Sequence, residues 1–187
     1  MTIVTRRVLL VPYNESLQSD FLVLNCCAKN RAQMNGPHTV ATAKLLFQNI
    51  LNDETLYARA VLDGRTRDYV GHIFISHLDS KPELGYIFDK AYWGQGIAYE
   101  ALRAFFTKAV RDLRLPQINA TSKVGHVASI RLLEKLGFEL IGQKCDDFGP
   151  YNQYRFISDD FRSDDCLADD ATFGEGVDKI LRPETLA

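Results

Sequence analysis

The stretch from Trp93 to Leu113, WGQGIAYEALRAFFTKAVRDL, joins a glycine-rich turn to a long amphipathic helix. Gly94 and Gly96 open the turn. Beyond it, apolar residues recur at helical intervals: Ala101, Leu102, Phe105, Phe106, Ala109, Val110 and Leu113. The first turn of a helix leaves backbone N–H groups without partners, and glycine lets the backbone approach a ligand with no Cβ in the way. We therefore expect a phosphate group to bind where this helix begins.

Three kinds of phosphate site use a glycine-rich loop of this type. A dinucleotide (Rossmann) fingerprint needs a third glycine where Tyr99 stands, and the antiparallel meander expected before the loop does not suit it. A nucleoside-triphosphate loop needs Gly-Lys-Ser/Thr, which the chain lacks. The remaining interpretation is a site for the pyrophosphate of coenzyme A.

Outward from this stretch, the hydrophobic pattern alternates between the periods of strands and helices. Strand-like runs at 56–62, 69–78 and 83–88 precede it and predict an antiparallel meander. The other expected elements are strands at 7–12, 117–121, 138–141 and 151–157 and helices at 14–27, 40–51 and 126–136. The order β-α-α-β-β-β-α-β-α-β-β predicts an α+β fold, a mixed α/β sheet with helices on both faces.

Composition narrows the class of protein. The chain has 187 residues, 46% of them hydrophobic, and a net charge of -2, which suits one domain with its own core. The near-neutral charge disfavours a nucleic-acid binder, and no apolar run is long enough to predict a membrane span. The four cysteines form no CxxC and the four histidines no HxxxH. We therefore expect free thiols in a reducing cytoplasm and no metal site.

The end of the chain differs from the rest in charge. Residues 158–187 hold nine acidic and three basic side chains, whereas residues 1–157 hold 15 acidic and 19 basic ones. We therefore divide the chain into a body at 1–157 and an acidic C-terminal extension at 158–187. A solvated extension is the default interpretation. A lid, or an arm on the second subunit of a homodimer, are the alternatives.

Two motifs, in this order and at this spacing, resemble the GNAT superfamily of N-acetyltransferases. They are LGYIFDKAYWGQGIAYEAL at residues 84–102 and GHVASIRLLEKLGFELIG at residues 125–142, and they look most like the ribosomal-protein-alanine acetyltransferases. The resemblance implies that residues 1–157 form an acetyltransferase domain with a splayed central sheet. The strand at 83–88 would part from the parallel strand at 117–121, and the pantetheine arm of acetyl-CoA, the implied cosubstrate, would lie in the gap.

The resemblance also implies which residues contact the coenzyme. The strand end and the loop supply Ile87, Phe88, Trp93, Gly94, Gln95, Gly96, Ile97, Ala98 and Tyr99, mainly through the backbone. In the second motif, His126 stands where the wider family has Asn and is expected to contact pantetheine. Ser129 falls in the Ala/Ser position, and Leu133 replaces the family's tyrosine. The resemblance to the ribosomal-protein subgroup implies that Ser129 takes the tyrosine's place and protonates the departing thiolate.

Glu83 is the candidate base. A carboxylate on the strand before the loop can accept a proton from the acceptor ammonium, and burial would raise its pKa to suit that task; a surface position beside Lys81 is the alternative. The sequence thus predicts an N-acetyltransferase in which a primary amine attacks the thioester directly. A protein N-terminus is favoured as acceptor and a small amine is left open. The alternative function is a non-catalytic acyl-CoA sensor or scaffold of the same fold.

Overall fold

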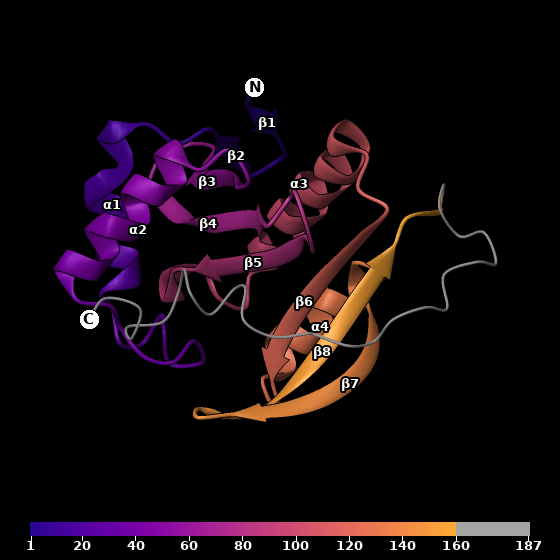
Figure 1. The fold of residues 1–187 in the computed structure, drawn as a ribbon. Coiled ribbons are helices and arrows are strands. Elements are labelled where there is room, and N and C mark those ends of the chain that lie inside the picture. The colour runs from indigo at the N-terminus through magenta and orange to yellow at the C-terminus, as the bar shows by residue number, and fades with distance from the viewer. Residues whose placement is uncertain (160–187) are drawn as a thin grey trace.

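The computed structural model describes residues 1–159, so the predicted extension at 158–187 lies outside them except for its first two residues. The strands of this part form one sheet in the order β1-β2-β3-β4-β5-β6-β8-β7 (Figure 1). They are β1 (Ile3–Val4), β2 (Val8–Val11), β3 (Tyr57–Asp63), β4 (Tyr69–Ser76), β5 (Glu83–Phe88), β6 (Gln117–Lys123), β7 (Glu139–Asp146) and β8 (Gly149–Ile157). The helices are η1 (Glu15–Leu17), α1 (Gln18–Asn25), α2 (Val40–Asn52), η2 (Lys90–Tyr92), α3 (Ile97–Leu113) and α4 (Val127–Lys135).

This architecture confirms the predicted fold class. The meander β3-β4-β5 is antiparallel, and β5 runs parallel to β6. Local chemistry closes the first turn of the meander, because the Asp63 carboxylate accepts hydrogen bonds from the N–H groups of Arg65 (2.8 Å) and Thr66 (2.9 Å). The short strand β1, which pairs with β2 at the sheet edge, was not predicted.

The sheet is splayed between β5 and β6. These two strands pair at one position, Glu83 opposite Asn119, whereas β4 pairs with β5 along its whole length from Glu83 to Phe88. On its other side β6 pairs with β8 from Gln117 to Lys123. Figure 1 shows β6 turning away from β5 beyond their shared start. The predicted splay is therefore confirmed, and the gap opens toward the loop that follows β5.

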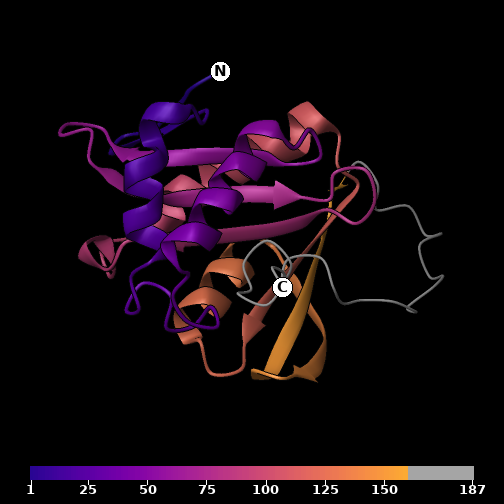
Figure 2. The same cartoon turned by 60° about the vertical axis from the view of Figure 1, so that its left-hand side comes forward.

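The two faces of the sheet carry different cores. One face, here called the α3/α4 face, packs α3 and α4 against apolar side chains that include Leu84, Phe88, Ile118, Ala120 and Tyr154. On the opposite face, here called the α1/α2 face, α1 and α2 cover β3 and β4 with a smaller core that includes Phe21, Phe47 and Phe74. Figure 2 shows α1 and α2 in front of the strands and α3 behind them. Every second side chain of β5, β6 and β8 thus points to the α1/α2 face.

No helix within the described residues is both long enough and apolar enough to cross a bilayer. Within residues 1–159, no group of three or more His, Cys, Asp or Glu side chains is arranged to hold a metal ion.

Candidate active site

The loop between β5 and α3 is built by local capping. Asp89 ends β5 and caps the short helix η2, accepting a hydrogen bond from the N–H of Ala91 at 2.8 Å. Asn30, from the segment between α1 and α2, makes two hydrogen bonds to this loop. Its Nδ2 donates to Asp89 Oδ2 at 2.9 Å, and its Oδ1 accepts from the N–H of Lys90 at 2.9 Å. Gly94 and Gly96 both have a φ of 73°, the left-handed conformation that favours glycine. This loop brings the chain back so that α3 begins beside the open end of the β5–β6 gap.

The start of α3 presents unpaired backbone donors. The N–H groups of Ile97, Ala98 and Tyr99 receive no hydrogen-bond acceptor from residues 1–159, and Gly96, as the N-cap, has no side chain to offer one. These donors coincide with the positive end of the helix dipole. The start of α3 is therefore a place where an anion can be bound by backbone groups alone.

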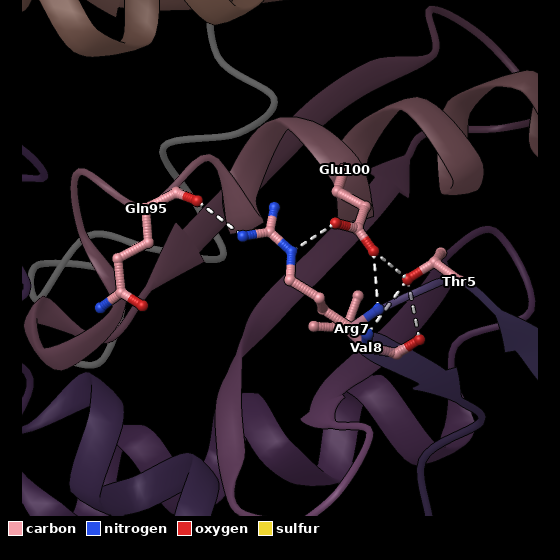
Figure 3. A network of polar contacts seen from close by, with 5 residues as sticks. All are labelled: Thr5, Arg7, Val8, Gln95 and Glu100. Carbon is pink, nitrogen blue, oxygen red and sulfur yellow. Dashed lines mark hydrogen bonds and ion pairs between the residues drawn. The ribbon is translucent and has the colours of Figure 1, made fainter.

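Arg7 adds a positive charge beside this helix end (Figure 3). Its Nε donates to Glu100 Oε2 at 2.7 Å, and its Nη1 donates to the carbonyl oxygen of Gln95 at 2.8 Å. Glu100 is held in turn by the Thr5 hydroxyl at 2.7 Å and by the Arg7 N–H at 2.8 Å. Burial raises the pKa of Glu100, but the bonds from Thr5 and Arg7 outweigh it, so that the pKa falls below its ordinary value. Glu100 therefore orients Arg7 toward the loop.

Backbone groups of β5 line the gap. The N–H of Asp89 donates to Val70 O at 2.8 Å, and Phe88 lies opposite Gly71, so the N–H and C=O of Phe88 face away from β4. The Phe88 carbonyl accepts a hydrogen bond from Trp93 Nε1 at 2.8 Å. By the same alternation, the N–H of Tyr86 faces the gap, whereas the backbone of Ile87 faces β4.

The second motif places Ser129 beside Tyr86. Ser129 lies in the first turn of α4 and is buried, and its Oγ is 2.9 Å from the Tyr86 hydroxyl oxygen. The Tyr86 hydroxyl also donates to the Ser129 carbonyl at 3.3 Å. Burial raises the pKa of Tyr86 to about 12, so its phenol stays protonated at neutral pH. Leu133, which replaces the family's tyrosine, is fully buried in the core.

His126 is the N-cap residue of α4, with its side chain half-buried and making no capping bond. Burial, and after it the Lys123 cation, lowers the pKa of His126, so its imidazole is neutral at pH 7. A neutral ring can donate one hydrogen bond and accept another.

Glu83 lies on the α1/α2 face, opposite in direction to Tyr86. Its Oε1 accepts a hydrogen bond from Thr121 Oγ1 at 3.5 Å, across the one paired position of β5 and β6. His72 lies on the same face but is buried in the core, with Nδ1 2.8 Å from the Tyr13 hydroxyl. His77 follows β4 and is bonded to Ser76 Oγ at 3.0 Å. The candidate proton acceptor, Glu83, and the candidate proton donor, Ser129, thus lie on opposite faces of the sheet.

Residues 7–139 match the family model described as the acetyltransferase (GNAT) domain, and the chain therefore belongs to the GNAT acetyltransferase family. A probable N-acetyltransferase of Bacillus subtilis, YjcK, is 41% identical over 59 residues, which are 32% of this chain and 33% of that protein. An uncharacterized protein of the same bacterium, YkkB, is 33% identical over 79 residues, 40% of this chain and 46% of that protein. The chain thus matches less than half of the length of each of these two relatives.

Solved structures share the fold at low sequence identity. The ribosomal-protein-S5-alanine acetyltransferase of Vibrio fischeri superposes with a TM-score of 0.75 at 15% identity, over 87% of this chain and all of that one. The spermidine N-acetyltransferase of Vibrio cholerae, in complex with CoA and spermine, gives a TM-score of 0.73 at 14% identity, over 82% of this chain and 96% of that one. At this level of identity the likeness establishes the fold.

Two residues of this site were missed by the sequence analysis. Arg7 comes from β1–β2, far from the loop in sequence, and the basic pair Arg6-Arg7 near the start was the one signal for it. Tyr86 was not predicted as a site residue, because nothing in the sequence indicates that its hydroxyl reaches Ser129.

Proposed function

We propose that the protein is an acetyl-CoA-dependent N-acetyltransferase that acts on a primary amine. The observation that carries the proposal is the uncapped start of α3 beside the open end of the β5–β6 gap. Membership in the GNAT family supports it, because that family uses acetyl-CoA. We also propose a cytoplasmic setting, because the cysteine pattern of the sequence predicts free thiols.

The residues present fit the coenzyme. The unpaired N–H groups from Gly94 to Tyr99, with the Arg7 guanidinium beside them, would hold the pyrophosphate. The pantetheine arm would run into the gap, where the N–H of Tyr86 would be its hydrogen-bond donor and His126 would be its neighbour on α4. Trp93 fixes the strand end through its bond to Phe88 O.

When bound, acetyl-CoA supplies the thioester carbon that the acceptor amine attacks, so that a C–N bond forms and the C–S bond breaks. In the proposed mechanism Glu83 accepts the proton of the acceptor ammonium, directly or through one water. The N–H of Phe88 donates to the thioester oxygen as negative charge grows on it. Ser129 donates a proton to the sulfur. The Tyr86 hydroxyl lies 2.9 Å from Ser129 Oγ and can turn its one proton from the Ser129 carbonyl to Oγ, which makes Ser129 a better donor. Holding the two substrates together supplies most of the rate.

A protein N-terminus is the acceptor we favour, on the likeness of the two motifs to ribosomal-protein-alanine acetyltransferases. The alternative, a non-catalytic acyl-CoA sensor, draws support from one observation. The family's tyrosine is replaced by Leu133, which is buried in the core and carries no acidic hydrogen.

The test combines coenzyme binding with acetyl transfer. We expect acetyl-CoA to raise the melting temperature, and a panel of amines to gain one acetyl group by mass spectrometry. Glu83→Gln is expected to lower kcat about 100-fold, while exposed Glu134→Gln serves as the matched control. Coenzyme-induced stabilisation without transfer to any amine would favour the sensor.

A second set of variants tests the hydroxyl pair. Tyr86→Phe and Ser129→Ala are each expected to lower kcat about tenfold, and the double variant no further, because both remove the same donor. Fully additive losses would contradict the proposed cooperation of Tyr86 with Ser129.

A further inference from the structure

A band of polar side chains lies on the α1/α2 face, next to the region that α1 and α2 cover. Its members come from three neighbouring strands and are here called the polar strip: Glu83 of β5, Asn119 and Thr121 of β6, and Gln153 of β8. Their sequence neighbours Ile118, Ala120 and Tyr154 point into the core on the other face, which fixes the direction of the strip. Glu83 pairs with Asn119, and Thr121 with Gln153, so the strip is continuous across the strands.

Asn119 presents a buried hydrogen-bond acceptor. Its side chain is 2% exposed, and within the described residues its Oδ1 has no hydrogen-bond donor. The orientation of this amide group is fixed by its nitrogen, because Nδ2 donates to the carbonyl oxygen of Pro82 at 3.5 Å. Buried polar atoms are nearly always paired, so an acceptor left in this state is a candidate contact for a ligand.

Gln153 presents the complementary donor. Its side chain is 5% exposed, and its Nε2 has no hydrogen-bond acceptor among residues 1–159. Its Oε1 lies toward Gly142 on the neighbouring strand β7, 3.8 Å from where a Cβ there would sit. Asn119 and Gln153 occupy diagonal positions of β6 and β8, so their side chains leave the same face of the sheet from neighbouring strands, roughly 7–8 Å apart.

We propose that the polar strip binds the first peptide unit of the acceptor. Asn119 Oδ1 accepts a hydrogen bond from the peptide N–H, and Gln153 Nε2 donates one to the peptide C=O. A trans peptide unit directs these two groups to opposite sides, so a chain that passes between the two amides is held from both. The α-amine, one carbon beyond that C=O, then lies toward Glu83. The acceptor class is an α-amino amide, as at the start of a peptide.

The same chemistry disfavours a polyamine. A protonated polyamine carries donors alone and cannot satisfy the N–H₂ group of Gln153. This inference rests on the proposed N-acetyltransfer and names its acceptor.

The experiment compares two acceptors of matched length in the full chain. Glycine N-methylamide carries the amine and one peptide unit, and n-butylamine carries the amine alone. We expect Gln153→Met and Asn119→Leu to lower the ratio of kcat/KM for the amide to kcat/KM for butylamine about tenfold or more. Asn119→Asp, which retains an acceptor oxygen, should restore most of the ratio. Exposed Gln143→Met is the matched control and should leave the ratio unchanged.

Further arms separate the outcomes. Melting temperatures identify any variant that fails to fold, and the Gln153 and Asn119 variants provide independent tests. A hexapeptide preferred over glycine N-methylamide would identify a protein or peptide as the source, and equal use would identify a small amino amide. An unchanged ratio in both variants, or spermidine as the best acceptor, would overturn the inference while leaving the N-acetyltransferase intact. Coenzyme binding without transfer to any amine would overturn the proposed function as well.

Discussion

Lowering the pH from 7 to 5 is expected to destabilise the fold through two buried histidines. His38 is 4% exposed, and neither of its ring nitrogens has a partner within the described residues. His72 is 2% exposed, stacked on Phe74 and bonded to Tyr13. Burial, and after it the Arg31 cation, lowers the pKa of His38 to about 4 and that of His72 to about 3.

The sign and size follow from linkage. Both folded-state pKa values lie below the ordinary value of about 6.5, so the unfolded chain binds more protons than the folded one between pH 6.5 and these values. Stability is therefore complete above about pH 6.5 and falls as the pH is lowered. At pH 5 each histidine lowers the free energy of unfolding by about 2 kcal/mol. The two together lower it by about 4 kcal/mol, a large share of the 5–15 kcal/mol that is usual for a folded domain.

Urea unfolding followed by circular dichroism at half-unit steps from pH 7 to 5 measures this effect. This pH range stays above the ordinary pKa of carboxylates, so that protonation of Asp and Glu contributes little to the change of the unfolding free energy with pH. Below pH 6 the slope should approach about 2.7 kcal/mol per pH unit, and His38→Leu or His72→Phe should each remove about half of it. A free energy of unfolding that stays flat from pH 7 to 5, or a slope that neither variant reduces, would refute the reasoning.

Two further predictions concern coenzyme binding and the core. Arg7→Gln should raise the Kd for coenzyme A about tenfold in isothermal titration, because the start of α3 loses its nearby cation. Arg111→Gln, at the other end of α3, is the control and should leave the Kd unchanged. Gly85→Ala should destabilise the fold by about 1–3 kcal/mol in chemical denaturation, because the new Cβ would lie 2.2 Å from the buried Phe74 ring. Gly142→Ala is the control and should change the stability little, because its new Cβ would lie 3.8 Å from its nearest neighbour, Gln153 Oε1.

Local patterns were sufficient to predict most of the fold. The period of the apolar residues predicted the helix α3 directly after the glycine-rich turn, and the strand at 83–88 was predicted with its observed bounds. Both depend on interactions between near neighbours in sequence, which periodicity and turn residues report directly. The β5–β6 splay came from the resemblance, since nothing in either strand alone indicates that the pairing stops after one position.

The parts of the site that were not predicted depend on long-range contacts. Arg7 reaches Gln95 and Glu100 because β2 lies beside the start of α3, and Tyr86 meets Ser129 because α4 packs on the face of the sheet to which Tyr86 points. Likewise, no local signal in the sequence indicates that the amide groups of Asn119 and Gln153 lack partners. Such facts emerge only when distant strands are brought into register.

The chain contains a single tryptophan, Trp93, which lies in the loop between β5 and α3. Its indole is 48% exposed and tied to the carbonyl at the end of β5. Any ligand that settles on the start of α3 changes the solvent and the hydrogen bonding around this one fluorophore. The tryptophan emission of the unmodified protein is thus an optical readout of a ligand at the start of α3. It needs no label and, when excited at wavelengths that the eight tyrosines do not absorb, comes from Trp93 alone.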